Sequence, residues 1–508
     1  MSAKNKNVCE GDCPFSRPLI MVLMSVLFIA ILYSHDISRL FNGPRPPVGI
    51  APLSLLLALG FTPFVLRRTG WTAGRPWLDI ATLFVAGGLA RLWPFFADSY
   101  LLLFVLLCLC AFIRLFINEK RSGAVQDCLV PLVMLMLVWG AGLRWQAHLD
   151  NMGCPLDPDA RGFLAIALSG GGPFNTVCDI APYVREPLFV WVVRTAFLIM
   201  PPGEQSLRLV TMLLSLGVIA AVYPAGKRWF GRVPALGAAC LCAWNPYFVL
   251  MSMRGLRFEL YILSILAFLW SLEYFGRRGE WGGVRVGAAA AACVLARITS
   301  FSFTIPLTLL YFFLRKGMAR ELIPALIIPF LFLAPHLHFN WRYSGDPMFT
   351  SNIHAKFYRN LEFAGQPGYP TLEEVTAHPY TGEPVTTVQY IFGHHTLGEL
   401  FTMGTRGLWL VFLRGYTTGG LFNYHKVLFL VYLAGVACVL FTKKREWLLV
   451  VLLLQGPSVV LAPLGMDWRL ALHTGPLMYL IGCYGVTRLL RLAWSRIRRT
   501  PPAPLSTP

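Results

Sequence analysis

Long apolar stretches separated by short polar connections dominate this chain between residues 18 and 486. Many approach the roughly 20 residues that an α-helix needs to cross a hydrocarbon layer about 30 Å thick. The pattern predicts an all-α, polytopic transmembrane bundle of about 14 spans. Two apolar stretches, residues 187–200 and 408–413, are too short to span and indicate interfacial helices in external loops.

Composition agrees with this fold class, because the 508 residues are 56% hydrophobic and only 14% charged. The net charge of +19 comes from Lys and Arg clusters between the apolar stretches, which argues against nucleic acid as a partner. Clusters at residues 227–232 and 443–445 fall inside if the N-terminus is cytoplasmic and residues 187–200 do not cross. The polar segments that follow residues 147 and 338 then face outside.

The domain organisation follows from where ionisable residues occur. Spans before residue 129 carry few of them, so residues 1–128 are predicted to form an added N-terminal membrane module. Residues 129–338 are predicted to form the catalytic membrane core, with the first external loop at 148–206. The remaining predicted regions are an external loop region at 339–426, C-terminal spans with a basic tail at 427–499, and a Pro-rich disordered tail at 500–508.

An acidic cluster, Cys154-Pro-Leu-Asp-Pro-Asp-Ala-Arg-Gly-Phe163, follows the fifth predicted span on the external side. A carboxylate placed there can act as a base at a membrane surface. Asp159 is the leading candidate, because the amphipathic stretch at residues 162–168 would hold it near the lipid head groups. Capping of a helix by Asp157 or Asp159 is the alternative, and spacing alone leaves both roles open.

Arginines gather at the external ends of predicted spans, where charge is costly unless it is paired or used. Arg254 and Arg257 are three residues apart and would share one helical face, so they could hold a phosphate, with Glu259 paired to either. Snorkelling of these arginines is the alternative role. The other candidates for binding an anionic substrate are Arg185, Glu186, Arg297 and Arg469.

Cys154 and Cys178 bracket the acidic loop outside the membrane, where a disulfide between them would restrain the loop; paired and reduced states both stay open. A divalent metal ion is a further open question, with His354 as the best external histidine to join a carboxylate. The chain has neither a Walker loop nor a dinucleotide fingerprint after a strand, so no nucleotide cofactor is expected.

Several motifs together resemble the polyprenyl-phosphate-dependent glycosyltransferases of the GT-C fold, which include protein O-mannosyltransferases and lipid A aminoarabinose transferases. The motifs are Pro158-Asp159 followed by Phe163, Arg185-Glu-Pro-Leu-Phe189, Leu207-Arg-Leu209 leading to Gly226-Lys-Arg-Trp-Phe-Gly231, and Asn340 through Gly345-Asp-Pro347. The resemblance covers residues 129 to the last span and implies that Asp159 is the catalytic base. Where the family often has a second acidic residue, this chain has Ala160, so Asp157 is the candidate for a second carboxylate. The Glu-Pro element implies a substrate or metal role for Glu186.

The resulting hypothesis is an inverting glycosyltransferase of the cell envelope, which moves a sugar from a polyprenyl phosphate to a lipid, glycan or protein acceptor. The expected location is the external face of a cell inner membrane. A transporter or flippase of lipid-linked glycans is an alternative, although it would place charges around a cavity at mid-membrane depth. A polysaccharide polymerase or ligase is the other alternative, because it shares the lipid-linked donor.

Overall fold

A computed structural model describes the chain at residues 140–145, 147–149, 151–170, 185–275, 281–314, 319–348, 367, 386, 388–393, 395–410, 426–442, 444–461 and 472–499. The chain divides into two units after Gly142, and the elements below belong to the second unit. Within the described ranges every regular element is helical and none is a strand, as the apolar pattern predicts. In these ranges Glu204–Trp229 and Arg320–Arg342 are the helices long and apolar enough to cross a membrane, so the predicted number of spans stays a prediction.

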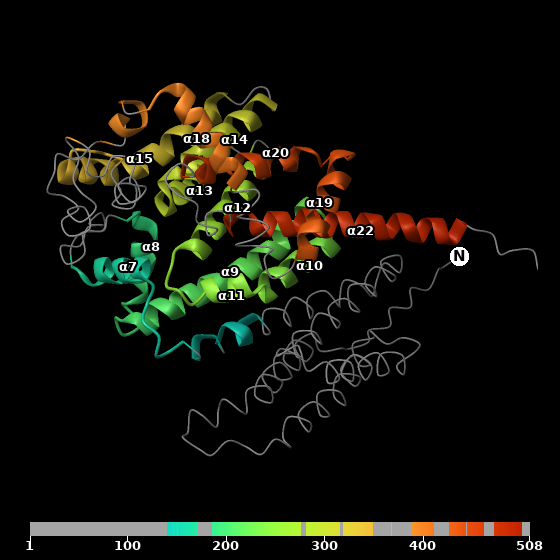
Figure 1. Ribbon diagram of the computed structural model, residues 1–508, viewed down its shortest axis with the longest axis horizontal. Coiled ribbons are helices and arrows are strands. Elements are labelled where there is room, and N and C mark those ends of the chain that lie inside the picture. The colour runs from blue at the N-terminus through green and yellow to red at the C-terminus, as the bar shows by residue number, and fades with distance from the viewer. Residues whose placement is uncertain are drawn as a thin grey trace, which may run out of the picture. The chain divides into compact units, whose positions relative to one another are not determined.

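A row of long helices forms the body of this unit. Its members are α9 (Glu204–Trp229), α10 (Arg232–Trp244), α12 (Phe258–Tyr274), α13 (Gly282–Ala296), α15 (Ala319–Ser344), α19 (Lys426–Leu440) and α22 (Gly475–Arg499). Each packs against the next in the spatial order α15, α13, α12, α9, α10, α22, α19 (Figure 1). Residues distant in sequence therefore meet across this row, and the C-terminal α22 lies against α10.

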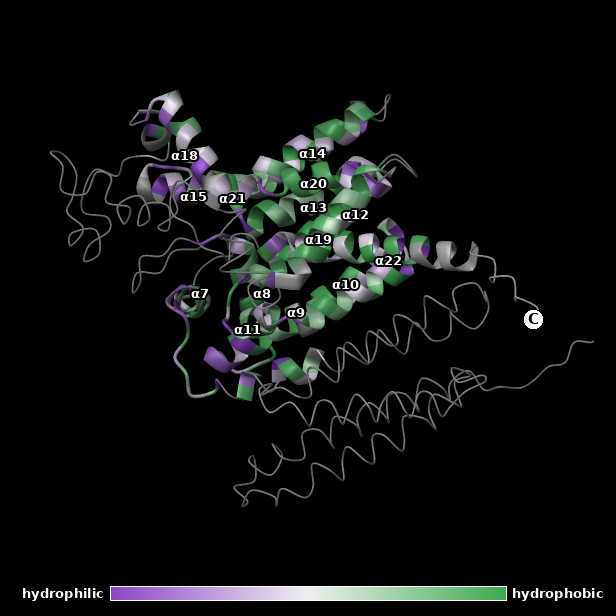
Figure 2. Cartoon of the chain, turned by 45° about the vertical axis from the view of Figure 1, so that its right-hand side comes forward, coloured by the Kyte–Doolittle hydropathy of each residue, from purple (hydrophilic) through white to green (hydrophobic). Residues whose placement is uncertain are grey.

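Shorter helices complete the unit. They are α7 (Pro158–Leu168), α8 (Pro187–Ala196), α11 (Pro246–Met251), η1 (Ile298–Ser300), α14 (Phe301–Leu314), η2 (Gln389–Gly393), α18 (Leu397–Leu410), α20 (Glu446–Leu453) and α21 (Gly456–Leu461). At 1.5 Å per residue, α8 is about 15 Å long, half the thickness of a hydrocarbon core. Its length agrees with the predicted interfacial helix. Figure 2 shows α12 and α14 as largely hydrophobic, whereas α7 and α18 carry hydrophilic segments.

Two of the apolar stretches that predict spans, residues 234–251 and 447–464, are interrupted. Residues 234–251 form α10 and α11, because Asn245 adopts an extended conformation before Pro246 and its side chain accepts a hydrogen bond from the backbone N–H of Tyr247. Residues 447–464 likewise include α20 and α21, which are separate helices. The apolar pattern did not reveal these breaks, because an apolar run can contain a helix end when a side-chain cap satisfies a free backbone N–H or a proline removes one.

Small residues allow the close approach of the long helices. A Cβ on Gly287 of α13 would lie 2.7 Å from the carbonyl oxygen of Pro324 in α15. A Cβ on Gly435 of α19 would lie 2.8 Å from the Cα of Gly482 in α22. Such contacts between backbones are typical of helices that associate inside membranes, where packing rather than water exclusion drives association.

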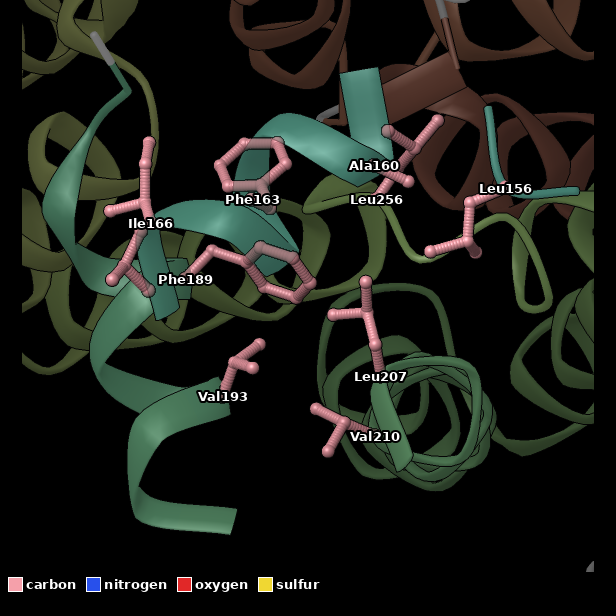
Figure 3. Packing of buried hydrophobic residues seen from close by; sticks show 10 residues of the cluster. Leu156, Ala160, Phe163, Ile166, Phe189, Val193, Leu207, Val210 and Leu256 are labelled. Atoms are coloured by element: carbon pink, nitrogen blue, oxygen red, sulfur yellow. The ribbon is translucent and has the colours of Figure 1, made fainter. Parts of the chain in front are cut away.

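A hydrophobic cluster joins α7 and α8 to α9. Phe163 of α7 and Phe189 of α8 meet edge to face with ring centroids 5.0 Å apart. Leu207 and Val210 of α9 and Leu256, just before α12, pack into the same cluster (Figure 3). This cluster fixes the acidic loop next to the start of α12, and these segments carry the candidate site residues.

Candidate active site

The two aspartates of the acidic loop have different partners. Asp157 is the N-cap of α7, and its Oδ1 accepts a hydrogen bond from the backbone N–H of Asp159 at 3.0 Å. Asp159, in the first helical turn, accepts a hydrogen bond on Oδ1 from Nη2 of Arg185 at 2.9 Å. Its side chain is 37% exposed. The structure therefore places the capping contact at Asp157 and an arginine contact at Asp159.

Arg185 lies directly before α8 and is almost fully buried. Burial lowers the pKa of its guanidinium, and the attraction of Asp159 opposes that change. The guanidinium carbon also lies 5.3 Å from the centroid of the Phe163 ring. The guanidinium of Arg185 therefore interacts with the Asp159 carboxylate and with the Phe163 ring.

Glu186 is the N-cap residue of α8 and forms a buried ion pair with Arg257, the N-cap residue of α12. Burial alone would raise the pKa of Glu186, but the attraction of Arg257, its own backbone hydrogen bond and the charges of Arg297 and Arg185 together lower it. Glu186 is therefore ionised at neutral pH and lies among three arginines.

Arg254 and Arg257 do not share a helical face, and the sequence prediction on this point is wrong. Gly255 between them has a φ of +70°, and Arg257 only begins α12. Arg254 instead approaches Asp157, with Nη1 at 3.6 Å from Oδ2. The two arginines consequently engage different carboxylates.

Glu259 pairs with neither of these arginines, which corrects the second part of that prediction. It lies in the first turn of α12 with only 1% of its surface exposed. Among the residues that the structure describes, neither carboxyl oxygen has a hydrogen-bond partner. The opposite charge that acts on it is that of Arg144, whose guanidinium binds Ser215 Oγ and the carbonyl oxygens of Ala243 and Cys242.

Arg297, at the end of α13, is the third arginine near Glu186, and together with Arg185 and Arg257 it forms the arginine group. It is 5% exposed, its charge acts on Glu186, and its guanidinium carbon lies 5.7 Å from the centroid of the Tyr261 ring. His336 of α15 faces Glu186 from another side, close enough for an electrostatic interaction. Asn340 Nδ2 lies 3.2 Å from His336 Nε2 and donates a hydrogen bond to the Pro347 carbonyl at 3.3 Å.

Arg208 was not predicted as a site residue, although it lies in one of the motifs. It is buried in α9 and donates hydrogen bonds to the carbonyl oxygens of Cys154 at 2.7 Å and Met253 at 3.2 Å. The first carbonyl begins the acidic loop and the second precedes Arg254. Arg208 thereby joins the backbones of the two segments whose side chains meet at Asp157. The sequence offered His336 as one of several external histidines for a metal ion; in the structure it lies beside Asn340 and near Glu186.

Three predicted residues, His354, Cys178 and Arg469, lie outside the described residues. Cys154 is an exposed free thiol, and the disulfide with Cys178 stays a prediction. The described part of the chain contains no group of three or more His, Cys, Asp or Glu side chains that could hold a metal ion. Glu186 pairs with Arg257 and lies in the field of two further arginines, and its predicted metal role stays a prediction.

Residues 182–339 match the family model of the dolichyl-phosphate-mannose-protein mannosyltransferases. The resemblance to GT-C glycosyltransferases is confirmed. The segment matched to this GT-C family includes Arg185, Glu186, Arg257 and Arg297, whereas the acidic loop with Asp159 precedes it.

No curated protein matches the chain. Two solved structures of an oligosaccharyltransferase from Archaeoglobus fulgidus are similar, each with a TM-score of 0.44. One is the archaeal enzyme AglB in complex with an inhibitory peptide and a dolichol-phosphate, 12% identical over 76% of this chain and 53% of that one. The other is the apo form, 13% identical over 74% of this chain and 52% of that one. The chain thus spans about half the length of these structures.

Proposed function

We propose that this protein is an integral membrane glycosyltransferase that transfers a sugar from a polyprenyl-phosphate donor to a lipid, glycan or protein acceptor. The observation that carries the proposal is the arrangement of Asp159, a partly exposed carboxylate, beside a group of buried arginines. Such an arrangement offers a base on the accessible side and positive charge on the buried side. Both are needed when an anionic leaving group departs from a sugar.

Asp159 is proposed to accept the proton of the acceptor's hydroxyl or amine. The acceptor atom then attacks the anomeric carbon, and the bond from that carbon to the phosphate oxygen breaks, so that polyprenyl phosphate leaves with the bonding electrons. A single displacement of this kind inverts the anomeric configuration. The hydrogen bond from Arg185 to Oδ1 orients the carboxylate for this step.

Arg257, Arg297 and Arg185 are proposed to bind the donor phosphate and to stabilise the charge that develops on it. Guanidinium groups suit this role because their planar N–H donors can engage two phosphate oxygens at once. Glu186 lies among these arginines and balances their charge when no donor is bound. We therefore propose that arginines, rather than a metal ion at Glu186, neutralise the leaving phosphate.

The location of the reaction is part of the proposal. The Lys and Arg clusters support a non-cytoplasmic position for the acidic loop, and the short length of α8 agrees with a helix that does not cross the membrane. We accordingly propose that the site faces outward from a cell inner membrane and receives both lipid-linked donor and acceptor there.

Replacing the base tests the function directly. We expect Asp159→Asn to lower transfer by roughly 100-fold or more, because it removes proton acceptance while retaining size and polarity. Asp157→Asn is the matched control, because asparagine is an equally good N-cap and should keep most activity. The measurement is mass analysis of glycolipids and glycans in membranes that contain each variant, together with rates of the purified proteins. Transfer by Asp159→Asn at the wild-type rate would refute the assignment.

A further inference from the structure

A second group of polar side chains lies near Arg297. Its members are not part of the site described above. This polar cluster consists of Tyr261, Thr299, Ser300, Gln455 and His473. They come from α12, η1, the connection between α20 and α21, and the turn before α22. Arg297 links the cluster to the arginine group, because its guanidinium lies near the Tyr261 ring while its charge acts on Glu186.

Contacts within the polar cluster show that its segments converge. The hydroxyl oxygens of Ser300 and Tyr261 are 3.0 Å apart, and the rings of Tyr261 and His473 have centroids 5.3 Å apart. His473 Nε2 lies 2.7 Å from the Leu454 carbonyl oxygen, next to Gln455. A Cβ on Gly456 would lie 2.8 Å from Ser302 Cβ, so the connection carrying Gln455 packs closely on the segment after η1.

Several hydrogen-bonding groups in this cluster are buried without partners. Gln455 is 1% exposed, and neither its Oε1 nor its Nε2 has a hydrogen-bond partner among the described residues. In the same part of the chain Thr299 Oγ1 is also buried and unsatisfied. Native proteins rarely leave such groups unpaired, because the lost hydrogen bonds to water are not replaced. A ligand or ordered water can complete them.

We propose that the polar cluster is the glycosyl subsite, which binds hydroxyl groups of the sugar carried by the lipid phosphate. This inference rests on the proposed function and names the part of the donor that the cluster recognises. The amide of Gln455 offers both a donor and an acceptor, as the hydroxyl of Thr299 does, and the vicinal hydroxyls of a sugar present the same combination. A phosphate held by Arg297 brings the attached sugar next to Tyr261, whose ring lies beside that arginine.

Part of the proposed subsite lies outside the matched family segment. Gln455 and His473 follow residue 339, where that segment ends. The arginine group and Thr299 lie within it. The segment would therefore supply phosphate binding, which every polyprenyl-phosphate sugar requires, while the C-terminal helices contribute to selecting the sugar.

Binding measurements on the full chain in lipid nanodiscs test this subsite. The probes are decaprenyl phosphate and its mannosyl, glucosyl and arabinosyl derivatives, and the variants are Gln455→Met and Thr299→Val. We expect wild type to bind at least one glycosylated probe more tightly than decaprenyl phosphate. Each variant should lose roughly 10-fold of that preference, corresponding to about one lost hydrogen bond, and should keep its affinity for decaprenyl phosphate.

Thr308→Val is the matched control, because the Thr308 hydroxyl is also buried but bonds to the Thr304 carbonyl of its own helix. The melting temperature of Gln455→Met without ligand should equal or exceed that of wild type, since an unsatisfied polar group is removed. A purely structural, water-filled cluster predicts the reverse: a lower melting temperature and an unchanged preference for the sugar.

The outcomes distinguish failure of the proposed subsite from failure of the proposed function. Wild type that binds every glycosylated probe no better than decaprenyl phosphate overturns the subsite, and so do variants with wild-type preference. If transfer still depends on Asp159 in either case, only the subsite has failed. If Asp159→Asn retains full transfer, the proposed function has failed as well.

Discussion

Glu186→Gln is the substitution that best separates charge balance from ligand contact in this site. Glu186 is buried, forms an ion pair with Arg257 and lies in the field of Arg185 and Arg297. Glutamine retains the size of the side chain but removes its charge. The variant therefore leaves three arginines close together without the carboxylate that compensates them.

The expected loss of stability follows from that burial. Breaking a buried ion pair by removing one partner typically costs about 3 to 5 kcal/mol, since an uncompensated charge stays buried. Arg257 is 19% exposed and water can screen it in part, so we expect about 2 to 4 kcal/mol. This loss should appear as a decrease of several degrees in the melting temperature of the ligand-free protein.

Affinity for an anionic ligand should change in the opposite direction. If a phosphate bound by these arginines lies about 8 Å from the carboxylate, the two charges repel by on the order of 2 kcal/mol at an effective dielectric constant of about 20. Its removal should raise the affinity for decaprenyl phosphate by roughly 10- to 30-fold. Saturating ligand should then restore much of the lost stability, because binding to the native state adds about 2.7 kcal/mol at 100 times the dissociation constant.

Thermal melts of the purified protein with and without decaprenyl phosphate measure both effects. Glu204→Gln is the control, because Glu204 is an exposed residue in the first turn of α9. Weaker binding of decaprenyl phosphate by Glu186→Gln would refute the reasoning and indicate that Glu186 contacts the substrate or a metal. An unchanged melting temperature would show that the ion pair with Arg257 does not stabilise the fold.

The remaining predictions concern the groups around Glu186. Arg257→Lys should raise the donor concentration needed for half-maximal transfer by roughly 10-fold, because lysine cannot make bidentate phosphate contacts; equal donor titrations would exclude a phosphate role. Arg208→Lys should lower the maximal rate more than donor affinity, because the single nitrogen of lysine lacks the fork with which Nη1 and Nη2 reach the Met253 and Cys154 carbonyls separately. A normal rate would count against this positioning role. Since the pKa of Glu186 is lowered by folding, its contribution is complete above about pH 4 and is lost in more acidic solution. The melting temperature of wild type should therefore fall more steeply than that of Glu186→Gln as the pH is lowered below about 4. Melting temperatures that fall in parallel for the two proteins would contradict this.

Several local features were predictable because they depend on neighbouring residues. The predicted spans at 284–298 and 301–314 correspond to α13 and α14, with η1 between them. Apolar length defines such helices, and the short polar or basic connections mark their ends. The helix start at Pro158 was also foreseeable, because an aspartate followed by proline is a typical N-terminal signal.

The pairing of charges was not predictable in this way. Arg257 lies two residues from Glu259 in the sequence, yet it pairs with Glu186, which is 71 residues away. The positive φ of Gly255 and the position of Arg257 at the start of α12 direct Arg254 and Arg257 to different carboxylates. Spacing on an assumed helix gave the wrong answer because the backbone turns there.

The sequence by itself indicated the helical class, the long apolar helices and the resemblance to GT-C glycosyltransferases, and it singled out the acidic loop and the Arg-Glu-Pro motif as candidates. These properties depend on hydropathy, charge and short motifs, which act over a few helical turns. Tertiary structure alone decided that Asp157 caps α7 while Asp159 meets Arg185, and that Gln455 and Thr299 belong to neighbouring buried segments. Burial and ion pairing depend on which helices pack together, and packing joins residues whose separation along the chain carries no signal.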